Sequence, residues 1–199
     1  KTSNKKNTLI HLFAKYDAYL DFDDFIESSL NIFVQKVNND TYLKIFDTYL
    51  VNTEVKPEVS NTLTFDLELN LEHEKFTLDA GFTAYENLSQ LNSDRYQFIL
   101  PYYNFSKSFL NDSNFGSFDF LSQGDNILKD TNSLRSRMIN NLNIQSYDFT
   151  SKNGFKNNFN YFLKNTITAG KNNEEYKSSP HTKLASIFEL QSSFPLSKI

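Results

Sequence analysis

Side chains alternate between apolar and polar from residue 63 to residue 84 with almost no interruption. The apolar set comprises Leu63, Phe65, Leu67, Leu69, Leu71, Phe76, Leu78, Ala80, Phe82 and Ala84. A period of two residues is typical of extended strands that have one apolar and one polar face. A ten-residue strand reaches ~33 Å and rises ~23 Å when it is tilted by ~45°. These strands are therefore close in length to the ~25 Å apolar band of an outer-membrane barrel.

The composition narrows the class of protein further. The 20 Phe and 11 Tyr residues, in a chain that is only 39% hydrophobic, fit pleated sheets better than a helical core. The net charge of -4 and the lack of a basic stripe argue against nucleic-acid binding. The absence of cysteine excludes a disulfide framework in these residues, and no apolar run is long enough for a transmembrane helix. The chain starts at Lys1 and ends in an apolar stretch, from which we expect an internal fragment of a longer protein.

The rest of the chain has the pattern of further strands separated by polar turns rich in Asn, Asp and Gly. The expected strands cover residues 8–20, 27–37, 41–51, 61–73, 76–86, 95–106, 115–124, 133–147, 155–169 and 182–194. We therefore expect an all-β fold, an antiparallel transmembrane β-barrel segment of about ten long strands, with residues 1–199 in one barrel domain. Several tyrosines near the expected strand ends suggest an aromatic girdle. They are Tyr42, Tyr49, Tyr96, Tyr102, Tyr103, Tyr147 and Tyr176.

The same alternation has a second interpretation. A soluble periplasmic β-sandwich, or a ligand-binding barrel, would also place apolar side chains on one face of each strand and polar side chains on the other. The pattern alone does not decide which face points outward.

No group of residues forms a recognisable catalytic or metal-binding motif. The acidic cluster that begins at Asp17 fails the spacing of an EF-hand loop, because the sixth position counted from Asp21 is Ile26 and not glycine. The histidines lack the spacing of metal ligands. Asp66 and Glu68 project to one face, but a glycosidase would also need a cleft and unequal environments for its carboxyl groups. We expect no enzyme activity, no cofactor and no metal ion.

Pro101 interrupts an otherwise strand-like run, residues 95–107. A proline removes one donor from a strand ladder, so it predicts a bulge, an edge strand or weakened pairing. A local kink without function is the simpler interpretation. In a barrel that passes something bulky, weak pairing would matter.

Several segments of the chain resemble the LptD family of lipopolysaccharide-assembly proteins. They are residues 39–43 (NDTYL), 95–107 (RYQFILPYYNFSK), 130–137 (DTNSLRSR), 140–142 (NNL), 154–158 (GFKNN) and 194–198 (FPLSK). The likeness runs from about residue 39 to the end, and it depends on the number and order of these segments and on no catalytic signature. It implies a barrel of about 26 strands in the cell outer membrane of a Gram-negative bacterium. In the family a periplasmic jelly-roll domain, which this chain lacks, precedes the barrel.

The resemblance also implies a function and partners. The family inserts lipopolysaccharide into the outer leaflet, so the implied partners are lipopolysaccharide, an LptE-like lipoprotein that plugs the lumen, and periplasmic Lpt bridge proteins that dock through the missing N-terminal domain. The lateral gate and the linking cysteines of the family lie outside the part that this chain resembles. They are not carried over to any residue here.

Two sets of residues follow from placing the chain in a barrel wall. The expected lipid-facing residues are Leu63, Phe65, Leu67, Leu69, Leu71, Phe76, Leu78 and Phe82. The expected lumen-facing residues are Asp66, Glu68, Asn70, Glu72, Asp79, Arg135, Arg137 and Asn141. A polar lumen suits either the passage of sugar or a plug protein, and the sequence does not separate the two.

Overall fold

A computed structural model describes residues 8–112 and 116–194, which form one antiparallel ten-stranded sheet. The strands are β1 (His11–Tyr19), β2 (Glu27–Val37), β3 (Thr62–His73), β4 (Phe76–Asn87), β5 (Tyr96–Asp112), β6 (Gly116–Lys129), β7 (Ser133–Ser146), β8 (Phe149–Thr150), β9 (Lys156–Lys171) and β10 (His181–Ser193). The helical segments are α1 (Tyr42–Phe46), η1 (Asp47–Tyr49) and η2 (Asn92–Arg95). The predicted all-β antiparallel fold is confirmed. In the described residues the sheet is open and does not close into a barrel.

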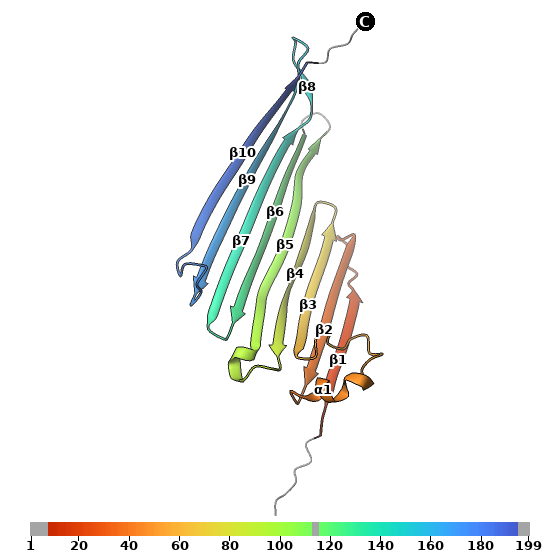
Figure 1. Ribbon diagram of the computed structural model, residues 1–199. Helices are drawn as coiled ribbons and strands as arrows, with labels where there is room; N and C mark the ends of the chain where they lie inside the picture. The colour runs from red at the N-terminus through yellow and green to blue at the C-terminus, as the bar shows by residue number, and fades with distance from the viewer. Residues whose placement is uncertain (1–7, 113–115, 195–199) are drawn as a thin grey trace, which may run out of the picture.

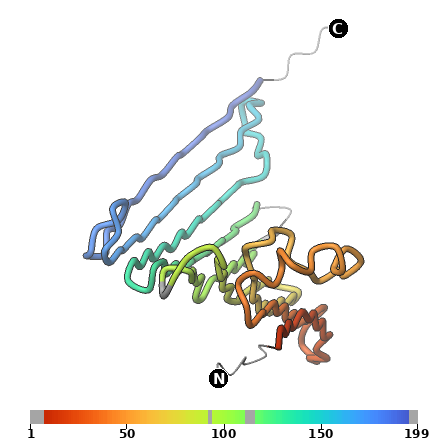
Figure 2. The backbone as a smooth tube through the Cα atoms, turned by 60° about the horizontal axis from the view of Figure 1, so that its bottom comes forward, coloured from red at the N-terminus to blue at the C-terminus, as the bar shows by residue number. Residues whose placement is uncertain are grey.

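The long strands lie side by side in chain order, from β1 at one edge to β10 at the other (Figure 1). The two-residue strand β8 is off this path and pairs only with β9. The sheet is twisted and curved rather than flat (Figure 2). Since neighbouring strands alternate in direction, β1 and β10 run the same way. An all-antiparallel closure would therefore need at least one further strand between them.

The two ends of the strands differ in their connections. At one end, called here the α1 end, lie the segment 38–61 and the loops 88–95, 130–132 and 172–180. At the opposite end, called here the hairpin end, lie the turns 20–26, 74–75 and 147–155. At the α1 end Asp130 and Thr131 have φ of 50° and 56°, as a type I′ turn requires. Among the described residues no helix is long and apolar enough to cross a membrane.

The prediction of a strand over 41–51 is wrong, because this region forms α1 and η1. Tyr42, Phe46 and Leu50 are each four residues apart and Leu43 is seven before Leu50, the spacing that a helix brings to one side, and all four belong to or pack against the core. Asn39 starts the turn, since its side-chain oxygen accepts hydrogen bonds from the backbone N–H and the hydroxyl of Thr41 at 2.8 and 2.6 Å. The other predicted long strands are present, with ends that differ by at most a few residues except where β5 and β6 extend further.

Pro101 predicted a bulge, an edge strand or weakened pairing, and the structure shows irregular pairing at this position within an interior strand. The pairing of β5 with β6 shifts register between Ile99 and Tyr102, and the pairing with β4 shifts at the same level. The one extra residue on β5 reverses the alternation, so that Phe98 and Tyr103 lie on the same face of the sheet although one number is even and the other odd. Alternation without a bulge would have placed Tyr102, and not Tyr103, on the same face as Phe98.

The buried core of the described residues is small and lies at the α1 end. It consists of Val37, Tyr42, Leu43, Leu50, Leu63 and Leu88. Segment 38–61 is held over the sheet by Gln35, which donates to the carbonyl of Val55 at 3.0 Å and accepts from the N–H of Thr64 at 2.9 Å. Leu63, expected to face lipid, is only 1% exposed, so it belongs to this core and not to the surface of the sheet.

Candidate functional site

The register of the strands gathers the apolar side chains on one face of the sheet, called here the apolar face. Residues directly opposite each other in an antiparallel pair share a face. Leu67 is opposite Ile32 on β2 and Phe82 on β4, and Leu69 is opposite Leu30 and Ala80. All eight residues expected to face lipid are on this side, with Leu63 buried at its margin. On β4 the apolar run from Phe76 to Ala84 measures about 27 Å along the strand.

Charged groups border the apolar face at the α1 end. Glu86 follows the last apolar position of β4 and pairs with Lys36 at 2.6 Å and with Arg95 at 2.9 Å. Arg95 also pairs with Asp40 at 2.7 Å, and this hydrogen bond is the main reason that the pKa of the Arg95 guanidinium is raised. The Tyr96 hydroxyl donates to Glu86 at 3.2 Å. The apolar surface of β2–β5 therefore ends at an ionic network.

An aromatic chain borders the same face at the hairpin end. Its ring-to-ring contacts run from Phe25 to Phe76, Phe105 and Phe120, with centroid distances of 6.0, 5.9 and 6.3 Å. Phe109 and Phe118 continue it, and Lys107 and His73 lie beside it.

Two of the seven tyrosines expected near strand ends lie there, since Tyr96 begins β5 and Tyr147 directly follows β7. Tyr42 and Tyr49 lie in helical segments and Tyr176 lies in a loop. Tyr102 and Tyr103 lie inside β5, because this strand extends to Asp112. The aromatic residues that border the apolar face at the hairpin end are mostly phenylalanines.

The opposite side of the sheet, called here the polar face, carries every residue expected to line a lumen. The register places Glu68 opposite Asn31, Asn70 opposite Asp79, and Arg137 opposite Asp125. Arg137 pairs with Asp125 at 2.7 Å, whereas Arg135 is 3.6 Å from the same carboxylate. Asp66 accepts a hydrogen bond from the Thr83 hydroxyl at 2.5 Å. Asn141 lies on this face too, and its buried side-chain oxygen has no hydrogen-bond partner in the described part of the chain.

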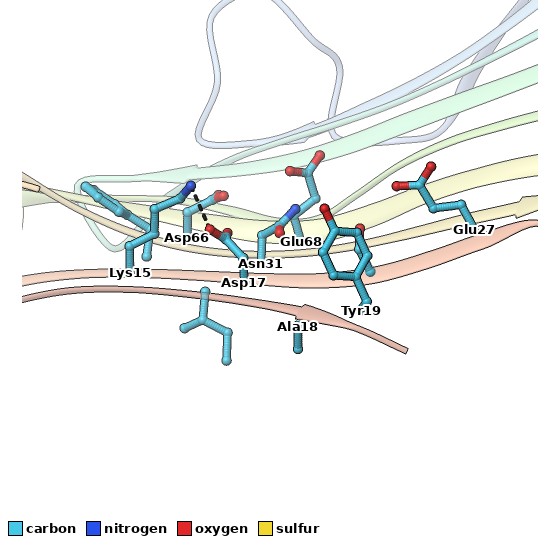
Figure 3. Close-up of a pocket in the computed structure, with 11 residues that line it drawn as sticks. Lys15, Asp17, Ala18, Tyr19, Glu27, Asn31, Asp66 and Glu68 are labelled. Carbon is cyan, nitrogen blue, oxygen red and sulfur yellow. Dashed lines mark ion pairs between the residues drawn. The ribbon is translucent and has the colours of Figure 1, made fainter. Parts of the chain in front are cut away.

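A hollow of about 560 Å³ opens on the polar face of β1–β3. Figure 3 shows Asp17, Glu27, Asp66 and Glu68 pointing to the same side of the sheet, while Ala18 points to the other side. Lys15 contacts Asp17 at 2.8 Å within it. No group of three potential metal ligands gathers anywhere in residues 8–112 and 116–194.

Two consecutive tyrosines of β5 cover glycines on opposite faces. On the polar face Tyr102 lies over Gly81, since a Cβ built there would be 2.8 Å from its hydroxyl. On the apolar face Tyr103 lies over Gly124, where a Cβ would be 2.5 Å from the ring. Glycine under an aromatic ring lets a sheet curve without losing packing.

A row of polar side chains crosses the apolar face, and sequence reasoning missed it. The Tyr103 hydroxyl is 3.0 Å from that of Ser122, Ser122 donates to Asn140 at 2.7 Å, and Asn140 donates to Asn165 at 3.4 Å. These residues lie on the adjacent strands β5, β6, β7 and β9. Because the amide and hydroxyl groups bond one another, they cost less on an apolar surface than isolated polar groups would. Only strand register reveals such a row.

Comparison with known proteins adds no relative. No family model, no curated protein and no solved structure matches the chain. The resemblance to the LptD family stays a prediction from the segments quoted above.

Proposed function

We propose that this chain is a segment of the wall of a transmembrane β-barrel in an outer membrane. The observation that carries the proposal is a single sheet with a broad apolar face, over which only the small core around Leu63 packs in the described residues, at the α1-end margin. Leu12, Leu184 and Leu190 on this face are 56%, 68% and 62% exposed. Soluble monomers rarely expose contiguous apolar patches beyond a few hundred Å². Lipid would cover the face along its length.

The dimensions of the sheet support the same proposal. The apolar run of β4, about 27 Å along the strand, would rise by about 20 Å at a tilt of 35–45°, and the hydrophobic band of such barrels is ~25 Å. The ionic network at one border and the aromatic chain at the other lie where headgroups and water would begin. β5, β7 and β9 have 17, 14 and 16 residues, whereas strands of soluble sheets usually have about five or six.

We propose further that the barrel belongs to the LptD family and helps to insert lipopolysaccharide into the outer leaflet. The support is the set of resembling segments and a polar face that bears carboxylates, amides and cations. Lipopolysaccharide, an LptE-like lipoprotein plug and periplasmic Lpt bridge proteins would be the partners. The outer membrane would be the location.

The alternative is a soluble periplasmic β-sandwich or ligand-binding barrel. A sandwich needs a second sheet about 10 Å from the apolar face, and residues 8–112 and 116–194 supply one sheet only. We therefore prefer the membrane barrel to the sandwich.

The experiment is fractionation of the full-length protein in its own cells, combined with depletion. We expect it in the outer-membrane fraction, resistant to extraction by high salt and carbonate. We also expect lipopolysaccharide to decrease at the cell surface when the protein is depleted. Recovery as a soluble monomer would favour the sandwich. An outer-membrane location with unchanged surface lipopolysaccharide would keep the barrel and remove the LptD assignment.

A further inference from the structure

The apolar face has two parts that differ in composition. On β3 and β4 its side chains are apolar without interruption, from Leu63 to Leu71 and from Phe76 to Ala84. On β6, β7 and β9, called here the mixed part, small and polar residues lie among the apolar ones. They are Ser122, Gly124, Asn126, Ser136, Asn140 and Asn165. Lipid-covered barrel walls are apolar, whereas segments that associate within membranes use small and hydrogen-bonding residues. The mixed part therefore has the composition of a contact with protein.

The row of Tyr103, Ser122, Asn140 and Asn165, called here the polar row, crosses the mixed part away from its borders. Asn140 lies near the middle of β7, between Met138 and Leu142 on the same face. Asn165 has apolar neighbours on both sides along β9 as well. A polar group at this depth in a bilayer has no water to bond. The row therefore lies where hydrogen-bonding groups are most costly if lipid is their only neighbour.

The hydrogen bonds within the polar row leave one end of it unsatisfied. Asn140 accepts from Ser122 at 2.7 Å and donates to the oxygen of Asn165 at 3.4 Å. The NH₂ group of Asn165 has no hydrogen-bond partner in residues 8–112 and 116–194. On the next strand the residue directly opposite is Leu184, which offers no polar side chain. An amide NH₂ carries two donors, so an acceptor for them has to come from outside the described sheet.

The polar row is also accessible. Tyr103, Asn140 and Asn165 are half-buried, and only Ser122 is buried. Met138, the neighbour of Asn140 on this face, is 39% exposed. The row spans four adjacent strands, which is about 14 Å across the sheet. A surface of this width is sufficient for a second barrel wall to approach it.

An identical row is a suitable partner for the polar row. Amides and hydroxyls both donate and accept, so a second copy supplies an acceptor for the free donors of Asn165. The row carries no charge, and two copies of it therefore do not repel each other. Two copies with the same orientation in one membrane are related by a two-fold axis along the membrane normal, which places each residue at the depth of its counterpart. At such an axis Asn140 and Asn165 meet the same two amides of the second copy.

We propose that a second copy of this chain docks on the mixed part within the membrane, with the two-fold axis at the Asn140–Asn165 pair. The proposal rests on the proposed barrel, because the polar row is costly only where lipid surrounds it. The mixed part contains no residue of the edge strands β1 and β10. The dimer is therefore compatible with closure of the sheet by further strands.

The test is photo-crosslinking in the full-length protein in its native membrane, from a position that leaves the polar row intact. A photoreactive residue replaces Met138 beside the row, and Leu69 on the uninterrupted apolar part is the control position. Two copies with different tags are produced together. We expect Met138 to give a product that carries both tags, and Leu69 to give lipid adducts only. At Met138, capture of another protein, of lipid alone or of nothing would overturn the proposal.

A pair of substitutions on β9 tests the role of the amide. Asn165→Leu should lower the crosslink yield at Met138 about tenfold, the loss expected for hydrogen bonds between segments within a membrane. Thr166→Leu makes a similar change on the polar face, at the next residue of the same strand, and should leave the yield unchanged. Equal yields in the two variants would overturn the proposal.

The unaltered protein gives a further test that no folding defect can affect. Fluorescently labelled protein is cut out of the membrane in polymer-bounded lipid discs, and its copies are counted by stepwise photobleaching. We expect two steps in most discs, and a single step throughout would overturn the proposal.

The failure of this proposal and the failure of the proposed function are distinguishable. Lipid adducts at Leu69 report the membrane wall, whatever Met138 captures, so a monomeric barrel would refute only the dimer. Crosslinks between copies from both Leu69 and Met138, in a protein recovered outside the membrane, would mean that two apolar faces pack together in water. That result would refute both proposals.

Discussion

Leu69 lies in the middle of the apolar face, so a charge placed there tests whether this face contacts lipid. It is directly opposite Leu30 on one side and Ala80 on the other. Four residues separate it from Phe65 and four from His73, which is about 14 Å along the strand in each direction. At a tilt of ~45° this becomes about 10 Å in depth on either side, close to the midplane of a ~25 Å band.

Leu69→Arg should therefore cost about 2–4 kcal/mol of folding free energy in a bilayer. This equals roughly a 30- to 700-fold decrease in the folding equilibrium constant, because each 1.4 kcal/mol is about tenfold. The control is Asn70→Arg, which adds the same charge at the same depth on the other face, directly opposite Asp79. It should cost less than about 1 kcal/mol, since it approaches carboxylates in a polar setting.

The measurement is reversible unfolding of the full-length protein in lipid vesicles by denaturant, followed by the loss of protease protection. Leu69→Ala separates the lost side-chain volume from the added charge. Equal costs for Leu69→Arg and Asn70→Arg would refute the membrane orientation. A larger cost at Asn70 would mean that the polar face is the one that faces lipid.

Three further substitutions test separate parts of the structure. Gly81→Ala should cost about 1–3 kcal/mol, because the added methyl group meets the backbone and the tyrosine that covers this glycine; an unchanged denaturation midpoint would contradict the close packing. Asn140→Leu should cost about 1–3 kcal/mol by leaving Asn165 without its donor, although it makes the face more apolar; a stabilised variant would mean that the polar row has no role in stability. The pKa of Asp148 is lowered mainly by the hydrogen bond from Asn158 and then by that from its lysine neighbour, so this carboxylate contributes stability above its ordinary pKa that is lost as pH falls through the lowered value. Asn158→Ala should move the titration midpoint of Asp148 upward by NMR, and no movement would refute the assignment.

Most of the fold was predictable because one physical signal dominates it. Alternation with a period of two depends on each strand alone, so it predicted the bounds of β2 and β3 within one residue. The same signal failed at residues 41–51, where aromatic and branched residues suggested a strand. The buried positions there follow a helical period, and Asn39 supplies the turn that starts it.

Features that depend on pairs of strands could not be predicted in the same way. The polar row on the apolar face joins Ser122, Asn140 and Asn165, which belong to three strands and align only when the register is known. The sequence predicted a disturbance of the pairing at Pro101, but neither its form nor its effect on the alternation along β5. The extra residue reverses the alternation along β5, so that Tyr103 lies on the apolar face and Tyr102 on the polar face.

The carboxylates of the polar face lie mainly on β1–β4 and its cations mainly on β6–β10, and this division too depends on the register between strands. Each strand contributes only a few charges, and none has an unusual composition by itself. The register then places Glu27 beside Glu72, and Lys164 on the strand next to Lys183, on opposite sides of a neutral β5. If the polar face had only to contact water, interspersed positive and negative side chains would make the sheet more stable, because opposite charges on neighbouring strands stabilise each other. The observed separation gives up that stabilisation within the sheet.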